Sequence, residues 1–344
     1  MQIVGPEDFL QLKKSNPLVD VRSPAEYLEG HIPGAFNIPI FDDHERAVVG
    51  TIFKKMGRIP AIEKGLEIVG PKMAGFVREA GRLAVSGQLL VHCWRGGMRS
   101  DSMAWLFERI GIQCSILEGG YKSYRNFLLE KVGNIHQLIV IEGFTGSGKT
   151  EILSCLKALG EQVIDLEGIA KHKGSVFGGI GQPAQPSTQQ FQNNLFDEIL
   201  QLDLSKRVWV EGESQTIGRV FLPDPFWDKM NIARNIEIFV PREDRIVRLV
   251  NEYGSLSNEL MENSIRNITK RLGDQQTNDI LKSYLSGDLS TVAGNLLEYY
   301  DKTYLFSREK YKKKYQEIIL PNGDASSNAQ IILKEIAGNN IEIK

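Results

Sequence analysis

The sequence predicts two consecutive α/β domains, each formed around a mostly parallel sheet. Short apolar segments alternate with stretches of helical spacing along the chain, which is the order found when helices join parallel strands. The chain has 344 residues, a length that suggests two domains and excludes neither one nor three. Hydrophobic residues make up 42% of the sequence and charged residues 24%, as in ordinary globular proteins.

The first half contains three expected strands and two expected helices. Ser23 suits the N-cap of the first helix, and Pro24 suits its first position, where a backbone N–H has no helical partner. Apolar residues at helical spacing mark the second helix. The strands are expected at residues 18–21, 88–92 and 114–117, and the helices at residues 23–28 and 99–110.

The second half begins after a helical stretch at residues 121–131. Five apolar segments separated by helical patterns are expected to form a second sheet. These segments cover residues 137–141, 162–166, 207–210, 236–240 and 317–320. We therefore expect a first domain at residues 1–125, a helical linker at 126–136 and a second domain at 137–344.

Charge and cysteine content narrow the class of protein. The three cysteines, Cys93, Cys114 and Cys155, are too few for a disulfide framework, and we expect a reducing cytoplasm. The sequence has no secretory signal pattern and no apolar run of the roughly 20 residues in a membrane span, so no membrane partner is expected. The formal net charge is −2, so nucleic-acid binding would require local basic patches.

The octapeptide GFTGSGKT, at residues 143–150, fits the phosphate-binding P-loop pattern. Its glycines allow backbone N–H groups to turn toward a phosphate, its lysine supplies a positive charge, and its threonine caps the next helix and can reach Mg²⁺. An apolar strand precedes the motif and an amphipathic helix follows it, as the motif requires. The predicted binding residues are Gly143, Gly146, Ser147, Gly148, Lys149 and Thr150.

Two glutamates follow the expected strand at residues 207–210. Glu211 and Glu213 either help to hold Mg²⁺, through water, or form a solvated strand end. The glycine-rich loop at residues 172–182 is likewise either a cover for the phosphate ligand or a plain surface loop. No cysteine pair has the spacing of zinc ligands. We assign no residue as a dedicated metal ligand and expect no tightly bound cofactor, and the requirement for Mg²⁺ stays open.

The stretch HCWRGGMRS, at residues 92–100, places a cysteine between a buried strand and a helix. A helix N-terminus and nearby arginines lower the pKa of a thiol, so Cys93 is predicted to be reactive. The two glycines allow amides to curl around an anion, and Arg99 can bind oxyanions. Cys114 and Cys155 lie in apolar segments and are predicted to be packing residues.

Two enzyme classes share this cysteine loop. Residues 92–100 satisfy the phosphatase pattern H-C-x5-R-[ST]. The upstream segments DVRSPAEY, at residues 20–27, and GHIPGAFNIP, at residues 30–39, resemble the first rhodanese signature. This resemblance makes residues 1–125 rhodanese-like. Arg99 comes six residues after the cysteine rather than five, so the loop is longer than in common single-domain sulfurtransferases and suits a larger, tetrahedral anion.

A rhodanese-like domain followed by a P-loop domain resembles the tRNA 2-selenouridine synthase family. The stretches VGTIFKKMG (49–57), HKGSVFG (172–178), VWVEGES (208–214) and VPREDRI (240–246) extend the match over nearly the whole chain. The resemblance implies an N-terminal rhodanese-like parallel-sheet domain and a P-loop NTPase-like α/β domain. It also implies a transferase that converts 2-thiouridine at wobble position 34 of tRNA to 2-selenouridine with selenophosphate. The implied intermediate is S-geranyl-2-thiouridine, made from geranyl diphosphate.

The same resemblance assigns roles to the two motifs. The P-loop would hold a diphosphate, although its pattern does not distinguish geranyl diphosphate from a nucleotide. Cys93 would handle selenium, either as a covalent selenopersulfide or by positioning selenophosphate, and Arg95 and Arg99 would bind the oxyanion. A rhodanese-related phosphatase or reductase and a P-loop NTPase remain the alternatives.

Basic patches in the second half are the candidates for binding tRNA phosphates. For each patch, a solvated helix face is the alternative. A further patch, with interleaved tyrosines, lies at residues 304–314. The predicted tRNA-binding residues are Arg242, Arg245, Arg248, Arg266, Lys270 and Arg271.

Overall fold

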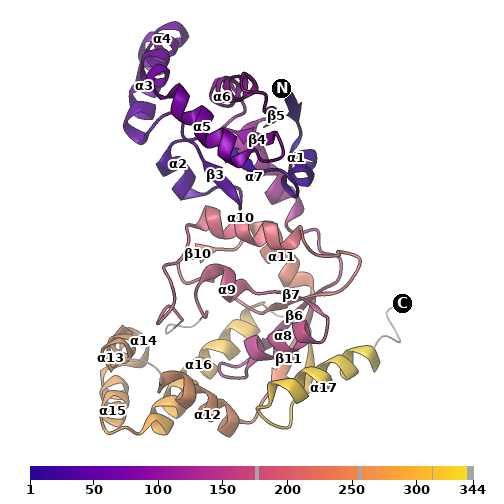
Figure 1. Ribbon diagram of the computed structural model, residues 1–344. Coiled ribbons are helices and arrows are strands. Elements are labelled where there is room, and N and C mark those ends of the chain that lie inside the picture. Colours follow the sequence, from indigo (N-terminus) through magenta and orange to yellow (C-terminus); the bar gives the residue numbers. More distant parts are fainter. Residues whose placement is uncertain (175–177, 255–257, 268, 312, 339–344) are drawn as a thin grey trace. The chain divides into compact units, whose positions relative to one another are not determined.

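The computed structural model describes residues 1–174, 178–254, 258–267, 269–311 and 313–338. The chain divides into two compact units (Figure 1). The first comprises Met1–Lys131 and Ser187–Asp197, and the second comprises Val132–Pro186 and Glu198–Lys344. Among the described residues, no helix has the length and apolar character needed to cross a membrane.

The first unit is built on a five-stranded parallel sheet with the strand order β1-β5-β4-β2-β3. The inner strands are almost entirely buried, as expected where helices cover both faces of a parallel sheet. Val19, Val91 and Phe107 lie in its core with no exposed surface. The strands are β1 (Gln2–Val4), β2 (Leu18–Asp20), β3 (Ala35–Asn37), β4 (Gln88–His92) and β5 (Gln113–Leu117).

Helices connect these strands. Ser23 and Glu26 form a capping box at the start of α2, with Pro24 at its first position, which confirms the predicted helix start. The helices are α1 (Pro6–Lys13), α2 (Pro24–Glu29), α3 (Asp43–Met56), α4 (Arg58–Val69), η1 (Gly70–Lys72), α5 (Met73–Leu83), α6 (Met98–Glu108) and α7 (Gly120–Lys131). Most of α10 (Thr188–Ile199) also belongs to this unit, although it lies in sequence between two strands of the second sheet.

The second unit contains a five-stranded parallel sheet with the order β12-β11-β6-β8-β7. Ile141, Trp209 and Ile236 contribute to its core. The strands are β6 (Leu138–Gly143), β7 (Gln162–Ile164), β8 (Val208–Glu211), β11 (Arg234–Phe239) and β12 (Tyr315–Ile319), and β9 (Thr216–Ile217) and β10 (Val220–Phe221) form a separate antiparallel pair. Both sheets confirm the predicted α/β fold class.

The helices of the second unit lie around this sheet and in an additional helical cluster. Leu249, Ile280 and Leu296 lie in the core of that cluster, and α12 packs against α16. The helices are α8 (Lys149–Ala158), α9 (Leu166–Ala170), α11 (Asp224–Ile232), α12 (Arg242–Tyr253), α13 (Asn258–Asn267), α14 (Thr269–Leu272), α15 (Asp274–Leu285), α16 (Leu289–Tyr311) and α17 (Ala325–Gly338). The first turn of α8 therefore begins inside the predicted P-loop.

Candidate functional sites: a phosphate loop and a cysteine loop

The phosphate loop joins the central strand β6 to α8. Gly148, the N-cap of α8, adopts φ 76° and ψ 27°, a left-handed conformation that favours glycine. The Nζ atom of Lys149 lies 3.1 Å from the carbonyl oxygen of Gly143 and 3.5 Å from a carboxylate oxygen of Glu211. The loop therefore combines a helix N-terminus with a lysine ammonium group, which is the arrangement that binds phosphate groups.

Two arginines of α12 bind the backbone carbonyl groups of this loop. Arg248 donates a 2.9 Å hydrogen bond to the carbonyl oxygen of Gly146 and forms a 2.9 Å ion pair with Glu151. Arg245 is buried, donates to the carbonyl oxygen of Thr145 at 3.3 Å, and pairs with Asp301 at 2.7 Å. Because both guanidinium groups bind loop carbonyls, they fix the backbone that presents the amide groups.

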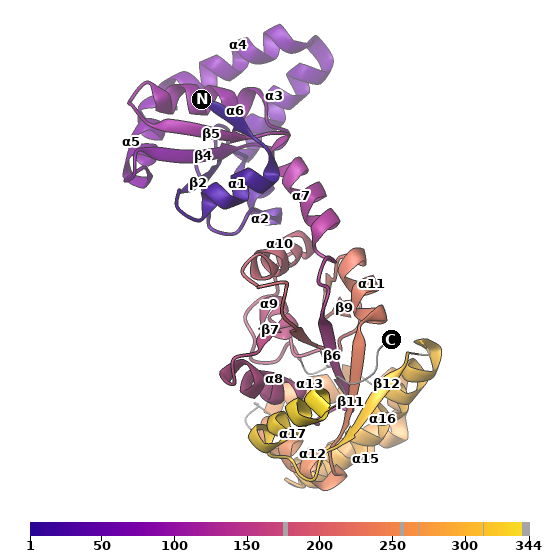
Figure 2. The same cartoon turned by 90° about the vertical axis from the view of Figure 1, so that its right-hand side faces the viewer.

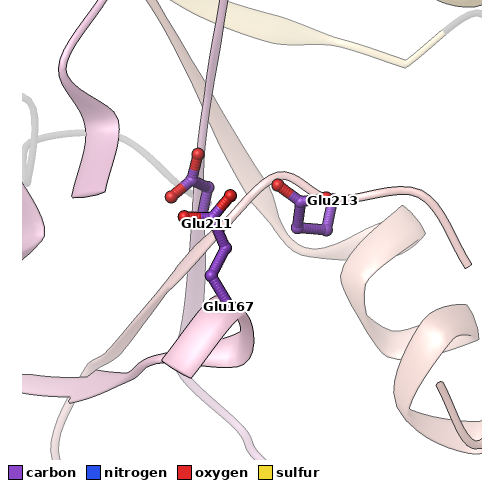
Figure 3. Close-up of side chains that lie close together, drawn as sticks. All are labelled: Glu167, Glu211 and Glu213. Atoms are coloured by element: carbon purple, nitrogen blue, oxygen red, sulfur yellow. The ribbon is translucent and has the colours of Figure 1, made fainter. Parts of the chain in front are cut away.

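Three carboxylates gather beside the loop (Figure 3). Glu167 extends from α9, Glu211 ends β8, and Glu213 follows two residues later. One ligand oxygen from each lies within 4.8 Å of the others. The Thr150 hydroxyl donates to Glu211 at 2.8 Å and also lies 3.2 Å from Glu167. Sequence analysis identified Glu211 and Glu213 but missed Glu167.

The carboxylate cluster lacks enough positive charge to balance it. Burial, together with the charge of Glu211, raises the pKa of Glu167 to about 8. Burial also raises the pKa of Glu213 well above its usual range, and Glu211 and Glu167 add to that rise. Lys149 acts in the opposite direction on both groups. Oxygen ligands crowded in this way, next to a P-loop hydroxyl, fit a hard divalent cation such as Mg²⁺.

The loop and the carboxylates open into one cleft of about 1450 Å³. Its polar lining includes Lys149, Thr150 and the three glutamates. Aromatic and apolar residues from α16, α12 and the loop at residues 172–182 form another part of the lining. These residues are Ile180, Val247, Leu249, Tyr299, Tyr300 and Tyr304. The ring centroid of Tyr304 lies 4.8 Å from that of Phe144 in the P-loop, so the aromatic lining adjoins the phosphate loop.

The glycine-rich loop at residues 172–182 contributes to the same cleft. Lys173, Gly174, Ile180, Gly181 and Gln182 line it. Residues 175–177 lie outside the described part of the chain. The described part of this loop therefore borders the same cleft as the phosphate loop, as the interpretation of the loop as a cover requires.

The cysteine loop lies at the carboxyl end of β4 in the first unit. Cys93 is 3% exposed, and its sulfur lies 3.3 Å from the Ser100 hydroxyl oxygen. Burial raises the thiol pKa, but the hydrogen bond with Ser100, the backbone of the loop and the charge of Arg99 outweigh it and lower the pKa below its usual value. Burial raises the pKa of Cys114 to about 12. The structure therefore distinguishes an activated thiol from an inert one.

The two arginines predicted to bind an oxyanion differ in their surroundings. Arg99 donates a 2.7 Å hydrogen bond to Glu26, which is the capping glutamate of α2. Arg95 is exposed at the loop surface. An anion at Cys93 would therefore meet one arginine already held by a carboxylate and one that faces solvent.

The start of α7 fixes the shape of the cysteine loop. The backbone N–H of Tyr121 donates to the carbonyl oxygen of Cys93 at 2.8 Å, and that of Lys122 donates to Trp94 at 3.0 Å. Gly96 has φ 58°, and a side chain there would lie 2.7 Å from the carbonyl oxygen of Leu117. Glycine is thus required where the cysteine loop passes the end of β5.

The predicted tRNA-binding residues lie in several environments. Arg242 and Arg266 are exposed, whereas Arg245 and Arg248 support the phosphate loop. The side chains of Lys270 and Arg271, in α14, lie outside the described part of the chain. In the further patch, Arg308 pairs with the buried Glu237 at 2.9 Å, and Lys313 pairs with Glu142 at 3.0 Å. Arg308 and Lys313 therefore neutralise carboxylates on strands of the second sheet. Binding of tRNA by the other patches stays a prediction.

Comparisons with known proteins cover both units. A family model described as a tRNA 2-selenouridine synthase AAA domain matches residues 136–336, and one described as a rhodanese-like domain matches residues 5–127. A tRNA 2-selenouridine synthase of Nitrosomonas europaea is 37% identical over 266 residues, covering 73% of this chain and 67% of its own. That of Shewanella frigidimarina is 36% identical over 286 residues, covering 81% and 75%. That of Sulfurovum sp. is 34% identical over 369 residues, covering 95% and 97%.

Proposed function

The chain belongs to the tRNA 2-selenouridine synthase family, and from this premise we propose that it converts 2-thiouridine at position 34 of tRNA to 2-selenouridine. The proposed route has two steps, S-geranylation with geranyl diphosphate and then replacement of the geranylated sulfur by selenium from selenophosphate. The observation that carries the proposal is the presence of two different anion sites in one chain. One is the phosphate loop with its aromatic cleft, and the other is the loop of Cys93.

We assign the first step to the cleft of the second unit. Amides of the phosphate loop and Lys149 would bind the diphosphate. The aromatic and apolar lining, with Tyr304 beside the loop, gives a prenyl chain a surface to pack against. The thiouridine sulfur would form a bond to C1 of the geranyl group as the bond from C1 to the diphosphate oxygen breaks. N3 of the base would then release its proton.

Thr150, Glu167, Glu211 and Glu213 are the residues that would hold Mg²⁺ against the diphosphate. When bound, the ion would supply positive charge that stabilises the leaving diphosphate. The chain itself supplies Lys149, which lies 3.5 Å from Glu211 and can turn toward a phosphate that enters the loop. The raised pKa of Glu167 fits a cation site, because a bound cation would replace the proton that this carboxyl group otherwise holds.

We assign the second step to the loop of Cys93, where the selenium donor would meet the geranylated base. Selenium would bond to C2 as the bond from C2 to sulfur breaks, geranylthiol would leave after taking up a proton, and water would receive the phosphoryl group. Arg99 and Arg95 would bind the oxyanion of selenophosphate. Geranylation favours this step because an alkylated sulfur is a better leaving group than a thiocarbonyl sulfur.

The test is mass spectrometry of nucleosides from 2-thiouridine tRNA incubated with the protein, geranyl diphosphate, selenophosphate and Mg²⁺. We expect 2-selenouridine in the complete mixture and only S-geranyl-2-thiouridine when selenophosphate is withheld. If well-folded protein forms neither product but hydrolyses ATP without tRNA, the cleft is a nucleotide site. Hydrolysis of phosphate esters that depends on Cys93 would instead favour the phosphatase alternative.

A further inference from the structure

The hairpin of α3 and α4 extends beyond the sheet of the first unit (Figure 2). The two helices lie side by side, and Gly57, with φ 92°, forms the turn between them. Its base is firmly held, since Asp42 and Glu45 form a capping box and Gly65 packs on the ring of Phe41. The tip, residues 53–59, takes no part in either candidate site described above.

The tip exposes large apolar side chains that a folded monomer usually covers. Phe53 is 56% exposed, Met56 66% and Ile59 69%. They lie within seven consecutive residues on both sides of the turn, so the exposed apolar side chains are concentrated at one end of the hairpin. An exposed group of this kind indicates contact with another molecule.

The charge of the tip identifies the class of that molecule. Residues 46–62 include four cationic side chains and no acidic one, in a protein whose formal net charge is −2. Arg46, at the base, lies 3.7 Å from Glu26. Lys54, Lys55 and Arg58, at the tip, are exposed and form no ion pair within the described residues. Unpaired cations next to an exposed aromatic ring suit a nucleic acid, whose phosphates bind the cations and whose bases stack on the ring.

The base of the hairpin adjoins the cysteine site. Glu26 accepts a 2.7 Å hydrogen bond from Arg99 of the cysteine loop and pairs with Arg46 of α3. Helix α3 has 14 residues, so it extends about 21 Å from that point at roughly 1.5 Å per residue. A nucleic acid that contacts the tip could therefore follow the hairpin to Cys93.

We propose that the tip of the α3–α4 hairpin is a tRNA-binding surface, which rests on the function proposed above. Lys54, Lys55 and Arg58 bind backbone phosphates several nucleotides from the modified one, as the length of the hairpin requires. Phe53 stacks on an unpaired base or packs on a ribose, a role that needs an exposed ring. An anionic lipid surface is the competing partner for such a tip, and the experiment separates the two.

The experiment compares wild-type protein with the triple variant K54A/K55A/R58A, by fluorescence anisotropy with 2-thiouridine tRNA over a series of salt concentrations. We expect the variant to bind at least tenfold more weakly at low salt. The slope of log affinity against log salt should become shallower by about 2–3, because three phosphate contacts are lost. The matched control, R78A/R82A/K157A, removes three exposed cations elsewhere and should change the affinity less than threefold.

A second variant tests the aromatic ring. Phe53→Ala should weaken tRNA binding about 5- to 100-fold with little change in the salt slope, and Phe53→Tyr should restore it. Since these side chains are exposed, thermal unfolding and the alkylation rate of Cys93 should stay unchanged. Equal tRNA affinity and equal salt slope for the wild type and the triple variant would overturn the proposal, as would tip-dependent binding to phosphatidylglycerol vesicles without tip-dependent tRNA binding.

The failure of the proposed function has a different signature. If wild-type protein binds 2-thiouridine tRNA through the tip but forms neither nucleoside product, the reaction assignment is wrong and the surface stands. If wild-type protein forms both products and the tip variants match it in affinity and salt slope, the surface is wrong and the reaction stands.

Discussion

The side-chain amide of Asn193 donates a 2.8 Å hydrogen bond to the hydroxyl of Tyr121. Asn193 belongs to α10, which lies in sequence between β7 and β8 of the second sheet. Tyr121 in turn donates its backbone N–H to the carbonyl oxygen of Cys93, and its ring lies 3.8 Å from the guanidinium of the buried Arg22. Helix α10, which comes after the P-loop in the sequence, thus holds the tyrosine whose backbone binds the cysteine loop.

The first prediction concerns Asn193→Leu. The side chain has no exposed surface, donates to the carbonyl oxygen of His31 and accepts from Arg125 at 2.8 Å each. Leucine would leave these buried groups unpaired, so we expect the free energy of unfolding of the first unit to fall by about 2–4 kcal/mol. Selenation should decline more than geranylation, because the support of Cys93 is lost while the phosphate cleft is intact. Chemical denaturation and nucleoside mass spectrometry measure both effects.

Asn194→Leu is the matched control on the same helix. Asn194 is partly exposed and accepts a hydrogen bond from Gln190, its neighbour on α10. We expect an effect below about 1 kcal/mol and unchanged selenation, since solvent can replace that bond. Equal losses in the two variants would show that α10 packs on the first unit without positioning the cysteine loop.

The second prediction distinguishes two roles for the arginines of α12. Because Arg248 binds the carbonyl oxygen of Gly146, Arg248→Ala should lower geranylation about tenfold or more and raise the KM for geranyl diphosphate, with tRNA affinity nearly unchanged. Arg242 lies on the same helix, is exposed and donates to Gly294. Arg242→Ala should leave the KM for geranyl diphosphate unchanged. Weaker tRNA binding in Arg248→Ala alone would contradict the supporting role.

The elements that the sequence predicted are those whose signal is local. The phosphate loop and the cysteine loop each occupy about ten consecutive residues between a strand and a helix, and the buried parallel strands are almost wholly apolar. Strands β1 and β3 lie at the edges of the first sheet, and most of their residues are exposed or half-buried, so they lack the wholly buried run that marks the equally short β2. They are strands because their backbone groups pair with β5 and β2.

The unpredicted site residues depend on pairs that are distant in the chain. Glu26 meets Arg99 across 73 positions, and Asn193 meets Tyr121 across 72. No local pattern marks such contacts. Glu167 could have been found, because it follows the predicted strand at residues 162–166, and the carboxyl ends of parallel strands meet at one edge of a sheet.

The third prediction concerns pH and the carboxylate cluster. The pKa of Glu167 is raised to about 8 in the folded protein, above its ordinary value of roughly 4.3. The folded state therefore holds a proton that the unfolded state has released, and the stability that this proton contributes is lost as the pH rises toward 8. Without divalent cations, the contribution of Glu167 to Tm should fall between pH 5 and pH 8, and Mg²⁺ at pH 8 should restore it.

Glu167→Gln provides the control for this effect, measured by differential scanning fluorimetry with EDTA or Mg²⁺. The amide carries no charge, so the fall of Tm with pH should become smaller, and the rise of Tm with Mg²⁺ at pH 8 should shrink because a ligand is lost. Burial lowers the pKa values of His31 and His92, so their contribution to stability rises with pH and only the comparison with Glu167→Gln isolates Glu167. The same change of Tm with pH in the wild type and in Glu167→Gln, both in EDTA, would rule out a protonated Glu167 in the folded protein.

The fourth prediction concerns Ser100, whose hydroxyl lies 3.3 Å from the Cys93 sulfur and helps to lower the pKa of that thiol. Ser100→Ala removes the hydrogen bond and leaves the effect of burial, so the pH profile of iodoacetamide alkylation should shift to higher pH. A Cys155→Ala background removes the partly exposed third thiol. Selenation at neutral pH should fall while geranylation stays unchanged, whereas Cys93→Ser should abolish selenation alone. If Ser100→Ala does not change the pH profile of alkylation, the loop amides and Arg99 activate the thiol without Ser100.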